Sequence, residues 1–153
     1  MLETPHVALG IAMAVKTGNP WVAIPLSLAS HFLLDRVPHW NPHFYTETQK
    51  FGQPKKISTY IAVVDEMIAI ALTLFIAYKF MPDVNKSFLI LICSLLSVLP
   101  DQIKIPYFFC NRRFGLIKKW VDFERSIQVE VGPVWGILTQ TIVVLVSFYW
   151  VFS

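Results

Sequence analysis

The chain has 153 residues, of which 55% are hydrophobic and only 15% are charged, and its mean hydropathy is +0.54. Because a water-soluble domain carries about 25% charged residues, this composition excludes an ordinary soluble domain and indicates a single integral membrane domain, residues 1–153. The net charge is only +3, and no nucleic-acid partner is expected.

Two short apolar runs come first, at 5–17 and 20–35, and Gly18 and Asn19 between them are strong turn signals. Helices of these lengths would measure roughly 20 and 24 Å, which is short for a membrane span of about 20 residues. We expect either two thin spans or a short re-entrant hairpin. Thr4 is the expected N-cap of the first helix.

Three longer apolar runs follow, at 57–80, 86–103 and 132–152. The first and last would be about 36 and 31 Å long as helices, enough to cross roughly 30 Å of hydrocarbon. The polar segment at 36–56 is rich in proline, histidine and aromatics and is predicted to be an ordered loop. The sequence therefore predicts an all-α, polytopic membrane bundle of four or five helices.

The second polar segment, 104–131, interleaves basic residues with aromatic and aliphatic ones. This pattern favours an interfacial amphipathic helix, with anionic lipid headgroups as the partner of residues 104–130. The alternative is a solvated loop with a few buried aromatics. A homo-oligomer is left open.

The basic residues predict the orientation of the bundle. Segments 36–56 and 104–131 hold ten of the 13 lysines and arginines, and two intervening spans place both segments on one face. The opposite face holds the other three, Lys16, Lys79 and Lys86. Since cytoplasmic loops are enriched in Lys and Arg, we expect a cytoplasmic N-terminus and an external C-terminus.

Ionisable groups within apolar helices are the main functional signal, because each costs roughly 2.5–3.5 kcal/mol to insert into a membrane. The set comprises His6, His31, Asp35, Asp65, Glu66 and Asp101. The predicted topology brings these groups from four helices to the cytoplasmic leaflet. The outer half of the bundle has no comparable set.

His31 and Asp35 are the clearest pair. At positions i and i+4 they share one helix face, so both can bind one ion, or Asp35 can orient the imidazole. His39 follows in a proline-rich stretch that can fold back over the site. Alternatively, His31 and Asp35 only satisfy each other within the bundle.

Asp65 and Glu66 are adjacent, so they point about 100° apart and cannot both bind one ion. Asp65 is the preferred ligand, although one of the two carboxylates could instead cap a neighbouring helix. Asp101 is also a candidate ligand, and its alternative is an ion pair with Lys104 at i+3.

Together these residues predict a metal site with His6, His31, Asp35, Asp65 and Asp101 as ligands. A mixed nitrogen and oxygen set suits a divalent transition metal, with zinc or manganese the leading choices and Fe(II) a third. Such a metal lowers the pKa of bound water and polarises a carbonyl or phosphoryl oxygen, so hydrolysis is the expected chemistry, with Glu66 or His39 as general base.

Three short stretches carry a resemblance to a known family. They are Thr4-Pro5-His6, the segment Ser30 to Asp35 (SHFLLD) and Val98 to Asp101 (VLPD). The chain resembles the YdjM-like group of bacterial inner-membrane metal-dependent hydrolases, which carry motifs of this kind. The spacing of His31, Asp35, Pro38 and His39 is more distantly similar to zinc-dependent phospholipase C. Both resemblances imply a metal hydrolase.

The leading hypothesis is a membrane-embedded, metal-dependent hydrolase of an ester or phosphoester, including lipid esters, with its site at the cytoplasmic side. Two alternatives remain open. One is a transport or proton-relay module that uses Asp65 and Glu66. The other is a non-catalytic membrane scaffold whose buried polar groups hold the helices together.

Overall fold

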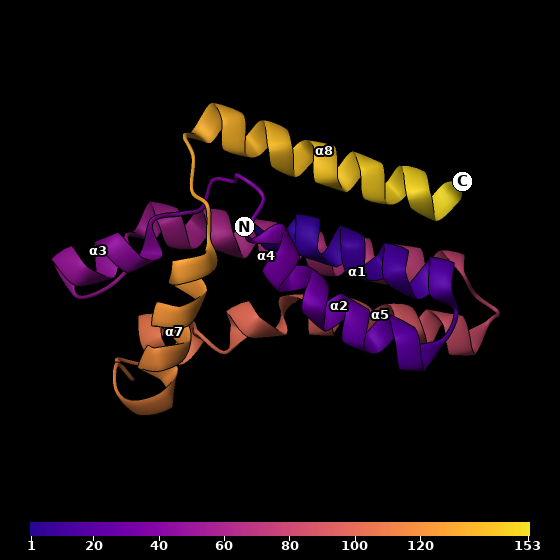
Figure 1. Cartoon of the computed structure of the whole chain (residues 1–153), viewed down its shortest axis with the longest axis horizontal. Helices are drawn as coiled ribbons and strands as arrows, with labels where there is room; N and C mark the ends of the chain where they lie inside the picture. Colours follow the sequence, from indigo (N-terminus) through magenta and orange to yellow (C-terminus); the bar gives the residue numbers. More distant parts are fainter.

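The computed structural model describes residues 1–153 and contains only helices as regular elements. In chain order these are α1 (Glu3–Thr17), α2 (Pro20–Leu34), α3 (Phe44–Phe51), α4 (Lys56–Lys79), α5 (Val84–Gln102), α6 (Ile105–Phe109), α7 (Gly115–Ile127) and α8 (Pro133–Phe152). Five of them, α1, α2, α4, α5 and α8, run side by side as a bundle (Figure 1). The predicted all-α bundle is confirmed.

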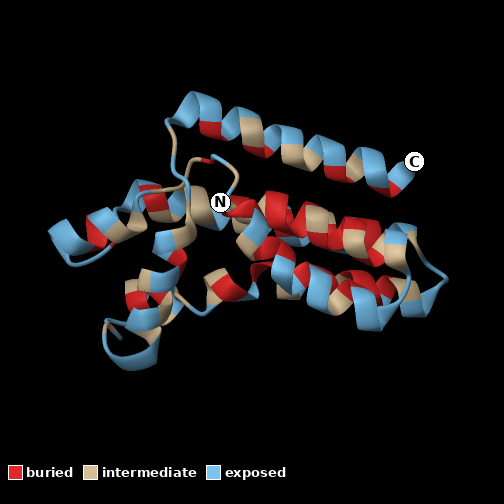
Figure 2. Ribbon diagram, in the orientation of Figure 1, coloured by how far each residue is buried: buried red, intermediate tan, exposed pale blue.

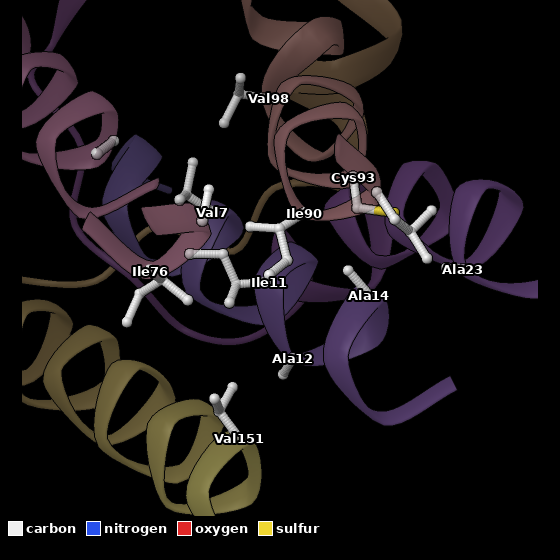
Figure 3. Close-up of a cluster of buried hydrophobic side chains, with 13 residues drawn as sticks. Val7, Ile11, Ala12, Ala14, Ala23, Ile76, Ile90, Cys93, Val98 and Val151 are labelled. Atoms are coloured by element: carbon white, nitrogen blue, oxygen red, sulfur yellow. The ribbon is translucent and has the colours of Figure 1, made fainter. Parts of the chain in front are cut away.

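Helix α1 lies at the centre of the bundle and packs against α2, α4, α5 and α8. Small residues allow these close approaches. A Cβ atom added at Gly10 would lie 2.8 Å from the backbone oxygen of Cys93 on α5, closer than packed atoms tolerate. Figure 3 shows the resulting core, in which Val7 and Ile11 of α1 meet Ile90 of α5 and Ile76 of α4.

The hairpin of α1 and α2 is set by its turn. Gly18 ends α1 in the left-handed conformation at φ 58°, where glycine has no steric penalty, and its N–H donates to the oxygen of Ala14. The side chain of Asn19 then caps α2 by accepting from the N–H of Trp21. Each helix has 15 residues, so both are shorter than a standard span.

Three segments are long and apolar enough to cross a membrane: Lys56–Lys79, Val84–Phe109 and Pro133–Phe152. Their outward faces carry large apolar side chains, and Figure 2 shows α8 largely exposed along its length. Trp135 at one end of α8 and Tyr149 at the other are 69% and 78% exposed. A surface this apolar is suited to lipid and not to water.

The remaining helices gather at the end of the bundle where α1 begins (Figure 1). Helix α3 occupies part of the segment predicted as an ordered loop, and α7 is the amphipathic helix expected within 104–131. The linker from α7 to α8 pairs with the loop after α2. There, the N–H of His39 donates to the oxygen of Val129, and its oxygen accepts from the N–H of Val131.

One local expectation was wrong. Helix α1 begins at Glu3, so Thr4 lies inside its first turn and is not the N-cap, and the preceding Leu2 has no capping side chain. The cap comes from a distant part of the chain. Asp65 of α4 accepts hydrogen bonds from the N–H groups of Glu3 and Thr4, which are two of the donors that a helix start leaves free.

Candidate metal centre

The candidate site lies at the end of the bundle where α1 starts and where α2 and α5 finish. His6 comes from the first turns of α1, His31 from the last turn of α2, and Asp101 from the last turn of α5. Asp35 is the residue immediately after α2, and Glu124 reaches in from α7. The side chains of these residues are fully buried, except for that of Asp101, which is 12% exposed.

His31 is at the centre of the cluster. Its Nδ1 lies 2.9 Å from the backbone oxygen of Ser97, so Nδ1 carries the proton and Nε2 presents a lone pair. That Nε2 has no hydrogen-bond partner, yet it lies 3.5, 3.7 and 3.9 Å from carboxylate oxygens of Asp35, Asp101 and Glu124. A backbone carbonyl that fixes the tautomer is the usual support of a metal-binding histidine.

His6 stacks on His31, with the ring centroids 4.2 Å apart and the planes inclined by 20°. Neither ring nitrogen of His6 has a hydrogen-bond partner, and its Nε2 is 3.5 Å from an oxygen of Asp35. Ligand atoms of His6, His31 and Asp101 all lie within 4.8 Å of one another. These three residues therefore form a group that can hold a metal ion.

The separations between these atoms are informative. At 3.5–3.9 Å, the nitrogen–oxygen distances around His31 are too long for hydrogen bonds. Ligands that bind one tetrahedral ion at about 2.0–2.2 Å are themselves about 3.4 Å apart. The nitrogens of His6 and the Nε2 of His31 are buried without a hydrogen-bond partner, and their spacing from the carboxylate oxygens is compatible with a divalent metal between them.

Carboxylates outnumber histidines in the cluster, and two ammonium groups balance part of their charge. Lys104 forms ion pairs with both Asp101 and Glu124, so the i+3 pair that was the alternative to a ligand role for Asp101 is present. The amino group of Met1 lies 2.6 Å from Oδ1 of Asp35. Burial raises the pKa of Glu124 to about 7, against the opposing effect of Lys104.

His39 lies beside the cluster and not within it. Its Nδ1 is 2.7 Å from the oxygen of Val37, and its Nε2 is 3.1 Å from the amide of Asn41 and 4.0 Å from an oxygen of Asp35. Burial lowers the pKa of this imidazole to about 4, so His39 is neutral near pH 7. Gln128 also donates to Asp35, at 3.2 Å. The loop and the linker thus support Asp35 from its outer side.

Asp65 does not join the ligands, contrary to the sequence expectation. One of its oxygens accepts from the backbone of α1, and the other accepts from the hydroxyl of Thr4 at 2.6 Å. Both oxygens are therefore committed to capping, which was the alternative for this pair of carboxylates. The adjacent Glu66 accepts a hydrogen bond of 3.0 Å from the side chain of Gln102.

Glu124 and Lys104 complete the cluster. The sequence named Lys104 only as an ion-pair partner of Asp101, and it did not predict Glu124. A signal for Glu124 was present in the amphipathic pattern of α7. Glu124 lies three residues after Val121, the other buried residue of this helix, so it is a carboxylate on the apolar face. A charged residue at such a position needs a partner inside the fold.

A cleft of about 260 Å³ opens beside the cluster. Asp101, Lys104 and Glu124 belong to both, so the cleft gives access to the carboxylate side of the candidate centre. Glu66 also lines the cleft, whereas His6, His31 and Asp35 lie behind its wall. A small molecule in the cleft could thus reach a metal held by the cluster.

The fold and this cluster together define the class of protein, which is a helical membrane bundle with a buried cluster of histidines and carboxylates at one end. No protein-family model matches the chain, and no curated protein or solved structure shows significant similarity to it. Function must therefore be inferred from the site itself.

Proposed function

We propose that the protein is a membrane-embedded, metal-dependent hydrolase of an ester or phosphoester, with its site at the cytoplasmic side. The main support for the proposal is the environment of His31. Its Nδ1 is held by the Ser97 carbonyl, while its unpartnered Nε2 lies among three carboxylates. His6, His31, Asp35 and Asp101 would hold the metal, with zinc or manganese the best match to a mixed nitrogen and oxygen set.

The chain's own residues supply the rest of the site. When bound, a divalent metal would activate water and polarise the ester. Glu66 lines the cleft and would accept the proton of the attacking water, while Lys104 would stabilise negative charge that develops on the substrate. We infer that His39 is a positioning residue and not the base, because it lies beside Asp35 and does not line the cleft.

Further support comes from the three motifs that resemble those of the YdjM-like group. They lie on three different helices, yet His6, His31, Asp35 and Asp101 meet at one place in the fold. We propose membership of that group on this basis. The basic residues of 104–130 would bind anionic headgroups at the cytoplasmic surface.

The experiment is a turnover assay of purified protein on phosphomonoesters, phosphodiesters and carboxyl esters, each with a lipid tail. We expect hydrolysis of one class that a chelator abolishes and added Zn²⁺ or Mn²⁺ restores. Glu66→Gln should keep the metal yet lower turnover by about 10²–10⁴-fold, the usual contribution of a positioned base. Metal-loaded protein with no turnover on any of these esters would refute the hydrolase.

One observation favours the scaffold alternative. Lys104 already neutralises Asp101 and Glu124, so the cluster could be a charge network that joins α5 to α7. In that case the purified protein would contain no metal, and Lys104→Met would destabilise the fold because it leaves two buried carboxylates unpaired. The transport alternative has less support, because Asp65 and Glu66 both already accept hydrogen bonds.

A further inference from the structure

The cleft has an apolar wall that continues onto the lipid-facing surface of the bundle. Ala62 and Val63 of α4 form one part of the wall, and Ile105, Phe108 and Phe109 of α6 form another. Helix α4 is one of the three helices long enough to span a membrane. The cleft therefore opens between a spanning helix and the polar end of the bundle.

Val63 marks the point where the wall reaches the outside. It is 51% exposed although it lines the cleft, and its neighbours on the same face of α4, Tyr60 and Met67, are 66% and 64% exposed. These side chains form one outward stripe. An apolar chain that leaves the cleft beside Val63 would pass directly onto a surface suited to acyl chains.

The volume of the cleft limits what it can enclose. Sites for drug-sized ligands measure about 300–1,000 Å³, and this cleft, at about 260 Å³, is smaller. It has room for a headgroup and the first carbons of a chain, so the rest of a lipid must lie outside. This division matches an amphiphile that enters sideways from the bilayer.

Charge in the cleft indicates what kind of headgroup fits. Lys104 is paired with Asp101 and Glu124, and Asp65 is committed to capping. The remaining acidic side chains that line the cleft are Glu3, Glu66 and Glu130, and the one remaining basic side chain is Arg125, which lies 4.0 Å above the ring of Tyr45. A headgroup with both a phosphate and an ammonium group matches this mixture, because a purely anionic one would face an excess of carboxylates.

We propose that the cleft binds a zwitterionic phospholipid from the adjacent leaflet, with its phosphate toward Arg125, its ammonium group toward Glu130, and its chains beside Val63. If the protein is the hydrolase proposed above, this lipid is its substrate, and only that assignment rests on the proposed function. Binding itself requires no turnover.

The test is photolabelling of the full-length protein in nanodiscs, with phosphatidylethanolamine that carries a diazirine on one acyl chain. We expect crosslinks on α4 and α6, near Val63 and Phe108. Val63→Trp fills the opening and should lower labelling roughly tenfold. The milder Val63→Phe serves if the tryptophan variant does not fold. Val146→Trp is the control, since Val146 is an exposed residue of the spanning helix α8 and does not line the cleft.

A second arm tests the headgroup. Phosphatidic acid with the same diazirine chain lacks the ammonium group and should label the cleft more weakly, and Glu130→Gln should reduce the difference between the two lipids. Equal labelling by both lipids, or labelling that Val63→Trp leaves unchanged, would overturn the proposal. Labelling without hydrolysis would leave the lipid cleft standing and remove the hydrolase. If the protein hydrolyses water-soluble esters but the lipid probe does not label it, the hydrolase stands and the lipid cleft is refuted.

Discussion

At the scale of single residues, the two carboxylates Asp65 and Asp101 show what the sequence can and cannot predict. Both lie in apolar helices that can span a membrane, and both were expected as ligands. Asp101 reaches the cluster because α5 ends there. Asp65 lies deeper along α4 and faces the start of α1. The rotation of α4 about its own axis determines which neighbour Asp65 faces. The hydropathy of the sequence does not predict that rotation.

The capping role of Asp65 leads to a prediction that separates it from the ligands. Asp65→Ala should remove the cap of α1 and cost about 1 kcal/mol of stability, with a lower melting temperature in detergent. The metal content should stay at the wild-type value, because no ligand is lost. Elemental analysis and thermal unfolding on the same preparation measure both. Loss of the metal with an unchanged melting temperature would restore Asp65 as a ligand.

At the scale of elements, the five bundle helices could be predicted because each depends on a local apolar run bounded by Pro, Gly or charged residues. The central position of α1 could not, because α1 and α2 both have 15 residues and their order in the bundle depends on contacts between helices that are distant in the sequence. Glu124 escaped prediction for a related reason. Its partners are His31 on α2 and Lys104 just before α6, so its burial depends on where α7 docks.

Gly136 of α8 approaches the loop after α2 closely, and this contact can be tested directly. A Cβ atom at Gly136 would lie 2.3 Å from the backbone nitrogen of Trp40, in the loop that supports Asp35. Gly136→Ala should therefore destabilise the protein by about 1–3 kcal/mol, as overpacking does. Gly132→Ala is the matched control, because no atom lies within 4 Å of the added Cβ. Equal melting temperatures for the two variants would mean that α8 does not pack in this way.

At the scale of the whole molecule, the proposed orientation follows from the bias of basic residues toward one face. Reporters fused after Gln53 and after Phe114 should be cytoplasmic, and a reporter within 82–85 should be external. Alkaline phosphatase and green fluorescent protein fusions measure the two sides independently. An external signal at Gln53 would invert the bundle and place the metal centre on the other face of the membrane.

We propose that His6, His31, Asp35 and Asp101 hold a metal, and the metal content of detergent-purified protein tests this directly. We expect close to one equivalent of a divalent transition metal. His31→Ala should lose most of it, since even a change in a supporting residue lowers affinity by roughly 10–100-fold. His43→Ala, which changes an exposed histidine outside the cluster, should retain it. Wild-type protein without a metal, or equal metal contents in the two variants, would contradict the claim.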